Sequence, residues 1–154
     1  MDSFLSFRVF SVSSARKEDP FMRKLNHIEP GTVHKAGEDY LEAVLVIQKK
    51  KGMVRSVDIA QHLNISKPSV SNGVSVLSAA GYLNMDADHF IHLTDEGRKI
   101  AERIYERHRF FSDFLVEIGV DRSVAEVDAC RMEHSISSES FQKVRKMCLE
   151  LLNR

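Results

Sequence analysis

Two helix signals separated by a single residue, at Asn64 and Ser66, constrain the fold of this chain more than any other feature. A short amphipathic segment is predicted to end at Asn64, because asparagine tolerates the left-handed conformation in which many helices terminate. The next helix is predicted to begin at Ser66, with Pro68 in its first turn, where a missing N–H removes no helical hydrogen bond. Two helices joined by so tight a turn form a helix–turn–helix, which presents the start of its second helix to the major groove of DNA.

Apolar residues at helical spacing define the elements around this turn. A first helix is predicted to begin near Gly37 and to stop at Gly52, after three lysines that suit the negative end of a helix. Ser56 is predicted to cap the short helix before the turn, and Gly81 to close the helix after it. The apolar positions expected along these three helices are Tyr40, Leu41, Val44, Leu45, Val57, Ala60, Leu63, Val70, Val74 and Leu77.

A β-hairpin and three more helices are predicted to follow. Residues 82–85 and 90–93 have strand character and flank a short polar loop, which indicates a small wing. Thr94 is predicted to cap a long helix that runs to Gly119, while Ser123 and either Ser137 or Ser138 begin the last two helices. One side of the long helix carries Ile100, Ala101, Ile104, His108, Phe111 and Leu115. The predicted fold class is mainly α: an N-terminal winged helix–turn–helix with a β-hairpin wing, followed by a helical domain.

Composition limits the class of protein. The chain has 154 residues, of which 43% are hydrophobic and 29% charged, as is usual for a globular protein that buries its own core. No apolar run approaches the roughly 20 residues that cross a bilayer, so no membrane partner is expected. Cys130 and Cys148 are too few for a disulfide framework, and a cytoplasmic location is expected. A net charge of zero leaves nucleic-acid binding to be decided by local charge.

Three parts are predicted along the chain. Residues 1–33 are an N-terminal extension of unknown role, without the basic start or long apolar run of a secretory signal. Its serine- and arginine-rich, acid-poor composition leaves three alternatives: a transit peptide, a loosely ordered extension, or an incorrectly chosen start codon upstream of Met22. Residues 34–106 are predicted to form the winged helix–turn–helix, and residues 107–154 the later helical domain.

Small polar groups gather at the start of the second helix of the helix–turn–helix. The residues predicted to contact DNA there are Lys67, Pro68, Ser69, Ser71 and Asn72, with Gly73 expected to allow a close approach. Local charge agrees, since five cations between residues 49 and 67 face one acid: Lys49, Lys50, Lys51, Arg55 and Lys67 against Asp58. The alternative is a winged helix that contacts protein, with its lysines simply solvated.

Two groups of metal-ligand residue types lie far apart in the sequence. Asp39 and Glu42 are three residues apart on the first helix, and residues three or four apart project from one helix face. Cys130, Glu133 and His134 bring a thiolate, a carboxylate and an imidazole together on a later helix. His108 adds a second imidazole if the long helix runs beside both groups.

Each of these residues also has an ordinary structural interpretation. The two carboxylates of the first helix can be a solvated helix start, His108 a packed histidine, and Cys130 a small core residue. Cys130 and His134 could also suggest nucleophilic catalysis, but no oxyanion donor or orienting partner accompanies them. Taken together, the residues are better explained as metal ligands.

Six segments of this sequence, in their order and spacing, resemble the diphtheria toxin repressor family of metal-dependent regulators, and particularly its manganese transport regulator branch. They are EDYLEA at 38–43, VDIAQHL at 57–63, SKPSVS at 66–71, LTDEGR at 93–98, RHR at 107–109 and ACRMEHSIS at 129–137. The likeness covers residues 36–141. It implies a homodimer whose winged helices bind palindromic double-stranded operator DNA and whose later helices form a dimerisation domain. A metal ion would bridge the first helix to that domain, and the regulator would repress metal-uptake genes.

The resemblance also implies a ligand set. Residues of this chain that match ligand positions of the manganese branch are Asp39, Glu42, His108, Glu133 and His134. Cys130 stands where that branch often has glutamate and matches the iron-responsive branch, which in turn has methionine where Asp39 stands. The glutamate is a bridging ligand in two-metal sites of the manganese branch, so the choice between one ion and two stays open. Glu126, one turn before Cys130, could join His108 in an ancillary site or simply face solvent.

The mixed donor set narrows the choice of metal ion but does not identify a single one. Hard carboxylates favour Mn²⁺ or Fe²⁺, and a thiolate shifts the preference toward Fe²⁺, Co²⁺, Ni²⁺ or Zn²⁺. Mn²⁺ or Fe²⁺ is the expected cofactor, with Mn²⁺ ahead, and the other three ions are expected to bind in vitro. No small-molecule substrate is expected.

Three other classes of protein are weighed against this prediction. A metal-independent winged-helix transcription factor would keep its DNA binding without the ligand residues. A metalloenzyme would use Glu133 as a general base, but the sequence has no substrate-pocket signature, so the chain is not predicted to be an enzyme. A structural interaction protein would show no salt-dependent affinity for DNA.

Overall fold

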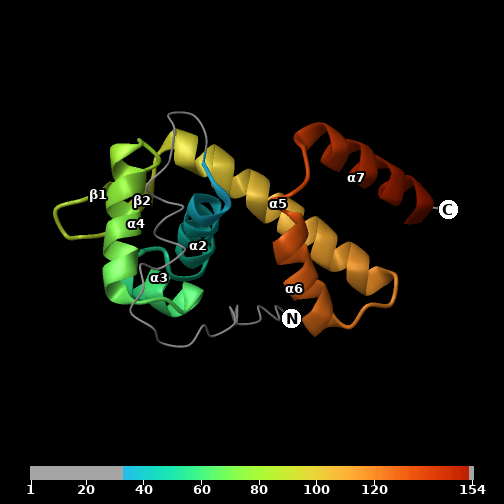
Figure 1. Cartoon of the computed structure of the whole chain (residues 1–154), viewed down its shortest axis with the longest axis horizontal. Coiled ribbons are helices and arrows are strands. Elements are labelled where there is room, and N and C mark those ends of the chain that lie inside the picture. The colour runs from blue at the N-terminus through green and yellow to red at the C-terminus, as the bar shows by residue number, and fades with distance from the viewer. Residues whose placement is uncertain (1–32, 153–154) are drawn as a thin grey trace. The chain divides into compact units, whose positions relative to one another are not determined.

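A computed structural model describes residues 33–152 of the chain, and it is helical apart from one hairpin (Figure 1). In chain order the elements are α2 (Lys35–Lys51), α3 (Ser56–Leu63), α4 (Lys67–Ala79), β1 (Leu83–Met85), β2 (Ile91–Leu93), α5 (Asp95–Glu117), α6 (Arg122–Met132) and α7 (Ser138–Leu152). The predicted mainly α fold with a hairpin wing is confirmed. The prediction of an extension at residues 1–33 falls almost entirely outside the described residues.

The described chain divides into two compact units, and the boundary falls within α5. The first unit ends at Ala101 and the second begins at Glu102. None of the helices described in either unit is both long and apolar enough to cross a membrane.

Helix α2 forms the centre of the first unit. Its predicted apolar positions are all buried: Tyr40, Leu41, Val44 and Leu45. Three lysines occupy the last turn, and Gly52 ends the helix with φ of 80°, a left-handed value that favours glycine. The predicted stop is therefore confirmed.

The N-cap of helix α3 lies one residue before the predicted position. Arg55, not Ser56, is its N-cap, and its backbone N–H donates to the Asp58 carboxylate at 2.9 Å. The Asp58 pKa lies below its usual value, chiefly because the Lys51 ammonium donates a hydrogen bond to the carboxylate. At the other end, Asn64 adopts φ 54° and ψ 48°, the left-handed conformation predicted for it.

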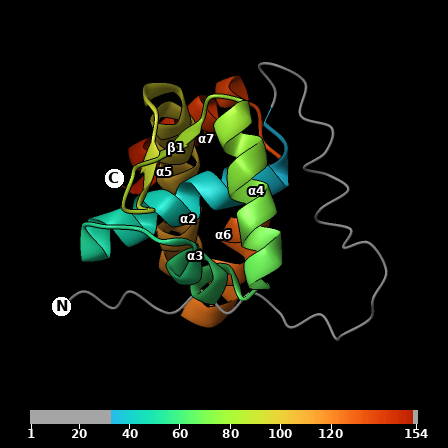
Figure 2. The same cartoon turned by 90° about the vertical axis from the view of Figure 1, so that its left-hand side faces the viewer.

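Helix α4 starts as predicted, and it packs closely against α2 (Figure 2). The Ser66 side chain accepts the backbone N–H of Ser69 at 3.3 Å. Gly73 is buried, and a Cβ there would lie 2.6 Å from Cζ of Tyr40. The Tyr40 hydroxyl donates to the Ser69 carbonyl at 3.0 Å. The expectation that Gly73 permits close approach to DNA is therefore wrong, because its missing side chain makes room for Tyr40.

Replacing Gly73 with alanine is expected to destabilise the first unit by about 1–3 kcal/mol, the usual penalty for overpacking a core. The ring of Tyr40 is fully buried and its hydroxyl is bonded, so it has no easy way to move aside. Urea denaturation of the full chain measures the effect. Ser75→Ala, an exposed change on the same helix, is the control and should stay within about 0.5 kcal/mol of wild type. Equal stabilities for the two variants would contradict the prediction.

The hairpin pairs Leu83 with Leu93 and Met85 with Ile91 in antiparallel register. Its turn is organised by Asp86, whose carboxylate accepts the N–H of Phe90 at 2.9 Å and lies 2.7 Å from Nε2 of His92. These contacts fix the wing predicted from the sequence.

Helix α5 begins at a cap that ties it to the end of α4. The Thr94 hydroxyl accepts the N–H of Gly97 at 3.1 Å and donates to the Gly81 carbonyl at 2.7 Å. The predicted cap at Thr94 is confirmed.

The second unit has a small aromatic core. Phe111, Ala129 and Phe141 are buried together, and the two phenylalanine rings meet edge to face with centroids 5.7 Å apart. Helix α6 begins at Arg122, one residue before the predicted start at Ser123, and it is capped by Asp121, which accepts the N–H of Ser123 at 2.9 Å. An aspartate before the first turn also suits the positive helix end.

Helix α7 begins at Ser138, as predicted. The hydroxyl of Ser137 accepts the N–H of Ser140 at 3.1 Å and so satisfies one amide of the first turn. Phe141 is buried, whereas Val144 and Leu151 are 39% and 61% exposed, which leaves much of the apolar surface of α7 uncovered within one chain.

Candidate functional site

A thiol, a carboxylate and an imidazole meet where α6 ends in the second unit. One ligand atom each from Cys130, Glu133 and His134 lie within 4.8 Å of one another. Helix α6 ends at Met132, so the prediction that all three lie on one helix is wrong in detail. Glu133 nevertheless keeps helical angles and donates its N–H to the Ala129 carbonyl at 3.0 Å, so the expected spacing survives.

The end of α6 is held by a buried arginine of α5. Arg107 donates to the carbonyls of Glu133 and Ile136, at 3.0 and 2.8 Å, and to the Ser138 hydroxyl at 3.0 Å. Carbonyls at a helix C-terminus have no partner within the helix, and a cation there is favourable. Arg107 thus fixes the backbone that carries the cluster. Sequence reasoning missed this role, although Arg107 lies between Ile104 and Phe111 at helical spacing on the buried side of α5.

Glu133 is the centre of the cluster. Its side chain is fully buried, with Oε2 2.7 Å from Nδ1 of His108 and Oε1 3.1 Å from Nε2 of His134. Burial alone raises the pKa of this carboxyl, but the hydrogen bonds and charges of the two histidines outweigh it, so the pKa lies below its usual value. The site therefore keeps Glu133 as a carboxylate, the form that binds a metal ion.

His108 joins the cluster from α5. Its Nε2 lies 3.0 Å from Oε2 of Glu126, and Oε1 of Glu126 accepts the Ser112 hydroxyl at 2.9 Å. The second unit thus brings together five residues singled out in the sequence: His108, Glu126, Cys130, Glu133 and His134. Ser112 was not predicted, and an isolated serine gives no signal that would have identified it.

The chemistry of this donor set fits a divalent transition-metal ion. Thiolate, imidazole and carboxylate are the donors that such ions take from proteins, and a carboxylate this deeply buried needs a cationic partner. Asp39 and Glu42 lie three residues apart on α2, in the first unit. Their participation stays a prediction, because they and the cluster belong to different units.

The residues predicted to contact DNA lie on the first two turns of α4. Lys67, Pro68, Ser71 and Asn72 are exposed. Ser69 is half-buried, and its hydroxyl lies 2.8 Å from that of Ser66, so it serves the helix cap. Asp58, the one acid counted against the nearby cations, pairs with Lys51 at 2.6 Å.

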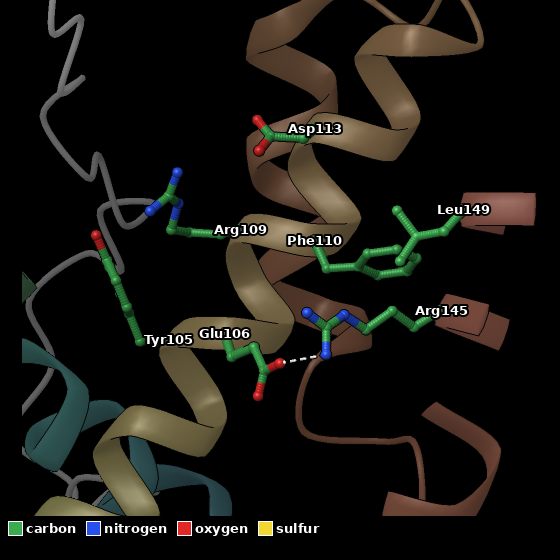
Figure 3. A pocket seen from close by; sticks show the side chains of 7 residues that line it. All are labelled: Tyr105, Glu106, Arg109, Phe110, Asp113, Arg145 and Leu149. Carbon is green, nitrogen blue, oxygen red and sulfur yellow. Dashed lines mark ion pairs between the residues drawn. The ribbon is translucent and has the colours of Figure 1, made fainter. Parts of the chain in front are cut away.

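A groove of about 380 Å³ lies between α5 and α7 in the second unit (Figure 3). Its lining consists of Tyr105, Glu106, Arg109, Phe110, Asp113, Arg145 and Leu149. Glu106 and Arg145 form an ion pair across it at 2.8 Å. None of these lining residues is among the predicted metal ligands, so the groove is not part of the candidate metal centre.

Two family models match the chain in succession. Residues 32–89 match the iron dependent repressor N-terminal DNA binding domain, and residues 94–151 match the iron dependent repressor metal binding and dimerisation domain. The first spans the helix–turn–helix, and the second contains the Cys130, Glu133 and His134 cluster.

Known proteins agree with these models. The transcriptional regulator MntR of Escherichia coli is 34% identical over 108 residues, which cover 70% of each chain. An uncharacterized HTH-type transcriptional regulator of Methanocaldococcus jannaschii is 34% identical over 110 residues, covering 70% of this chain and 88% of that one.

Solved structures give the same result. The manganese regulator SloR superposes with a TM-score of 0.65 at 25% identity, over 75% of this chain and 54% of that one. A manganese-dependent transcriptional repressor in complex with manganese gives 0.60 at 26% identity, over 73% and 52%. The chain therefore spans about half the length of these two solved regulators.

The resemblance recognised in the sequence is confirmed, and it points to a family of transcriptional regulators rather than enzymes. With a DNA-binding model on its helix–turn–helix, a metal-binding model on its thiol, carboxylate and imidazole cluster, and MntR among its relatives, the chain belongs to the iron-dependent repressor family of metal-dependent transcriptional regulators.

Proposed function

We propose that this chain is a regulator that binds palindromic operator DNA as a homodimer when it is loaded with Mn²⁺ or Fe²⁺, and that it represses metal-uptake genes. The observation that carries the proposal is the meeting of Cys130, Glu133 and His134 within 4.8 Å, with Glu133 fully buried. A cytoplasmic location is proposed with this function, because a reducing compartment keeps Cys130 as a thiol.

The proposed ligands are Asp39, Glu42, His108, Cys130, Glu133 and His134. When bound, the ion would supply positive charge that balances the carboxylates and the thiolate among these ligands. Glu133 and His134 would hold it from the segment after α6, and His108 would hold it from α5. Ligands contributed by both units would favour one relative orientation of the DNA-binding and dimerisation parts, and this is how the ion would select the DNA-binding form.

Manganese is proposed ahead of iron. The relatives support this choice, since SloR is described as a manganese regulator and the second solved repressor contains manganese. Cys130 is the reason that Fe²⁺ is retained as an alternative, because a thiolate is a softer ligand than the carboxylates around it. Co²⁺, Ni²⁺ and Zn²⁺ are expected to bind in vitro.

The start of α4 is proposed to enter the major groove. Lys67 supplies charge for a phosphate, while Ser71 and Asn72 are exposed and can hydrogen-bond to base edges. Metal and operator are then coupled, so each should tighten the binding of the other by the same factor, which corresponds to about 1–3 kcal/mol for typical linkage.

The test begins with the metal content of the full chain purified without chelators. Duplexes selected from a random pool by the Mn²⁺-loaded protein then serve as the operator probe, at one fixed salt concentration. We expect tight binding with Mn²⁺ or Fe²⁺ and at least tenfold weaker binding with chelator. Identical affinity under all three conditions would instead identify a metal-independent winged-helix factor.

Replacing Lys67 with alanine is expected to weaken binding to all duplexes alike, because a phosphate contact is independent of sequence. The slope of log affinity against log salt should become shallower by about 1. Lys99→Ala is a matched control, since Lys99 is an exposed lysine of α5 that pairs with Glu96 at 2.7 Å. A shallower slope in the control but not in Lys67→Ala would show that the recognition surface lies elsewhere.

A further inference from the structure

Glu126 lies on α6, one turn before Cys130, and its carboxylate is held from inside the second unit. Its Oε1 accepts the Ser112 hydroxyl at 2.9 Å, and its Oε2 lies 3.0 Å from Nε2 of His108. Ser112 and His108 are 2% and 7% exposed. The surface partner Arg122 is farther away, at 3.7 Å. The closest contacts of Glu126 are therefore with buried groups, although 33% of its side chain is exposed.

The imidazole of His108 stands between two carboxylates. Nε2 faces Glu126, while Nδ1 lies 2.7 Å from Oε2 of Glu133. An ionised carboxylate can only accept hydrogen bonds, so each ring nitrogen is placed to donate, Nε2 to Glu126 and Nδ1 to Glu133. An ion bound beside Glu133 would take the place of the proton on Nδ1, whereas the Nε2–H could stay bonded to Glu126. Nδ1 is also the nitrogen that faces the candidate metal centre.

We propose that Glu126 is a positioning residue of the metal centre. By accepting the Nε2–H of His108, it fixes the orientation of the ring, and it thereby holds Nδ1 beside Glu133. Ser112 holds Glu126 in turn, so the contacts run without a break from Ser112 to Glu133. Partners that orient ligating residues in this way typically change metal affinity 10- to 100-fold.

This role differs from direct ligation in an ancillary site. A positioning carboxylate changes how tightly the ion binds and leaves the number of bound ions unchanged, whereas removal of a ligand of a second site loses an ion. The inference rests on the proposed function for its metal-binding consequence, but the contact between Glu126 and His108 can be tested in the metal-free chain.

The first experiment is ¹⁵N-resolved NMR of the histidine side chains in the full, metal-free protein, with His108 assigned from a His108→Gln variant. We expect a slowly exchanging Nε2–H signal from His108 in wild type, and its loss in Glu126→Ala. Glu126→Gln keeps an acceptor oxygen and is expected to restore the signal. The same signal in wild type and Glu126→Ala would overturn the proposal.

The second experiment titrates the same variants with Mn²⁺ and, for its visible spectrum, with Co²⁺. Glu126→Ala should bind 10- to 100-fold more weakly with unchanged stoichiometry and a shifted Co²⁺ spectrum, and Glu126→Gln should fall between it and wild type. Two variants serve as controls and should match wild type: Arg122→Ala removes the surface partner, and Asp128→Asn neutralises another α6 carboxylate, which pairs with Arg131 at 3.3 Å.

The remaining outcomes separate the two proposals. Unchanged affinity in Glu126→Ala, or the loss of one bound ion per chain, would overturn the positioning role. A wild-type chain that binds neither ion would overturn the proposed function and, with it, the metal role of Glu126, whatever the NMR result.

Discussion

Glutamine in place of Glu133 is expected to weaken Mn²⁺ binding by more than about 100-fold, beyond the range typical for the partners that merely orient a ligand. The substitution keeps the size of the side chain but removes the negative charge at the centre of the cluster, where His108 and His134 approach to 2.7 and 3.1 Å. Isothermal titration of the full chain measures the loss. Operator affinity in the presence of Mn²⁺ should fall to the value that wild type shows with chelator.

The control for Glu133→Gln is Asp128→Asn. Asp128 is also a carboxylate of α6, but it faces Arg131 and lies outside the cluster. Its neutralisation should leave both affinities unchanged. Wild-type Mn²⁺ affinity in Glu133→Gln would place the metal centre elsewhere in the chain.

Replacing Arg107 with methionine is expected to destabilise the second unit by about 3 kcal/mol. Two carbonyls, of Glu133 and Ile136, lose their donor, and each buried acceptor left without one costs about 1–3 kcal/mol. Methionine fills similar space, so the effect reports lost hydrogen bonds and charge rather than a cavity. Thermal unfolding monitored by circular dichroism measures it.

Arg109→Met separates this effect from a general loss of positive charge on α5. Arg109 is exposed and lies over the Tyr105 ring at 6.0 Å, a weak interaction, so its replacement should change stability by less than about 0.5 kcal/mol. Equal melting temperatures for the two variants would show that Arg107 does not hold the end of α6.

The sequence predicted most of the fold because its signals are local. Gly52 and Asn64 end helices through left-handed backbone, and Ser66 and Thr94 begin them through side-chain oxygens, all within a few residues of the turns concerned. The errors are also local. The N-caps of α3 and α6 are Arg55 and Asp121, and an aspartate carboxylate accepts a backbone N–H at each of these helix starts.

The candidate site was less predictable, because its contacts join residues far apart in the chain. Residue types and spacing indicated Cys130, Glu133 and His134, which do meet. Periodicity does not reveal that Arg107 ends α6, nor that Ser112 and Glu126 are bonded, since these contacts depend on how three helices pack. Gly73 was misinterpreted for the same reason. Its place near the start of the recognition helix suggested a close approach to DNA, but the residue that packs against it is Tyr40, 33 positions earlier in the chain.

Tyr40 has a mechanical consequence. In the sequence, Tyr40 lies between the proposed ligands Asp39 and Glu42. Its ring packs against Gly73, and its hydroxyl donates a hydrogen bond to the Ser69 carbonyl. Because the Tyr40 ring is fully buried and its hydroxyl is hydrogen-bonded, α2 and α4 are closely packed and resist moving relative to each other. If an ion displaced residues 39–42, the start of α4 would therefore move with them. The DNA-binding unit would respond as one body, without a hinge between α2 and α4.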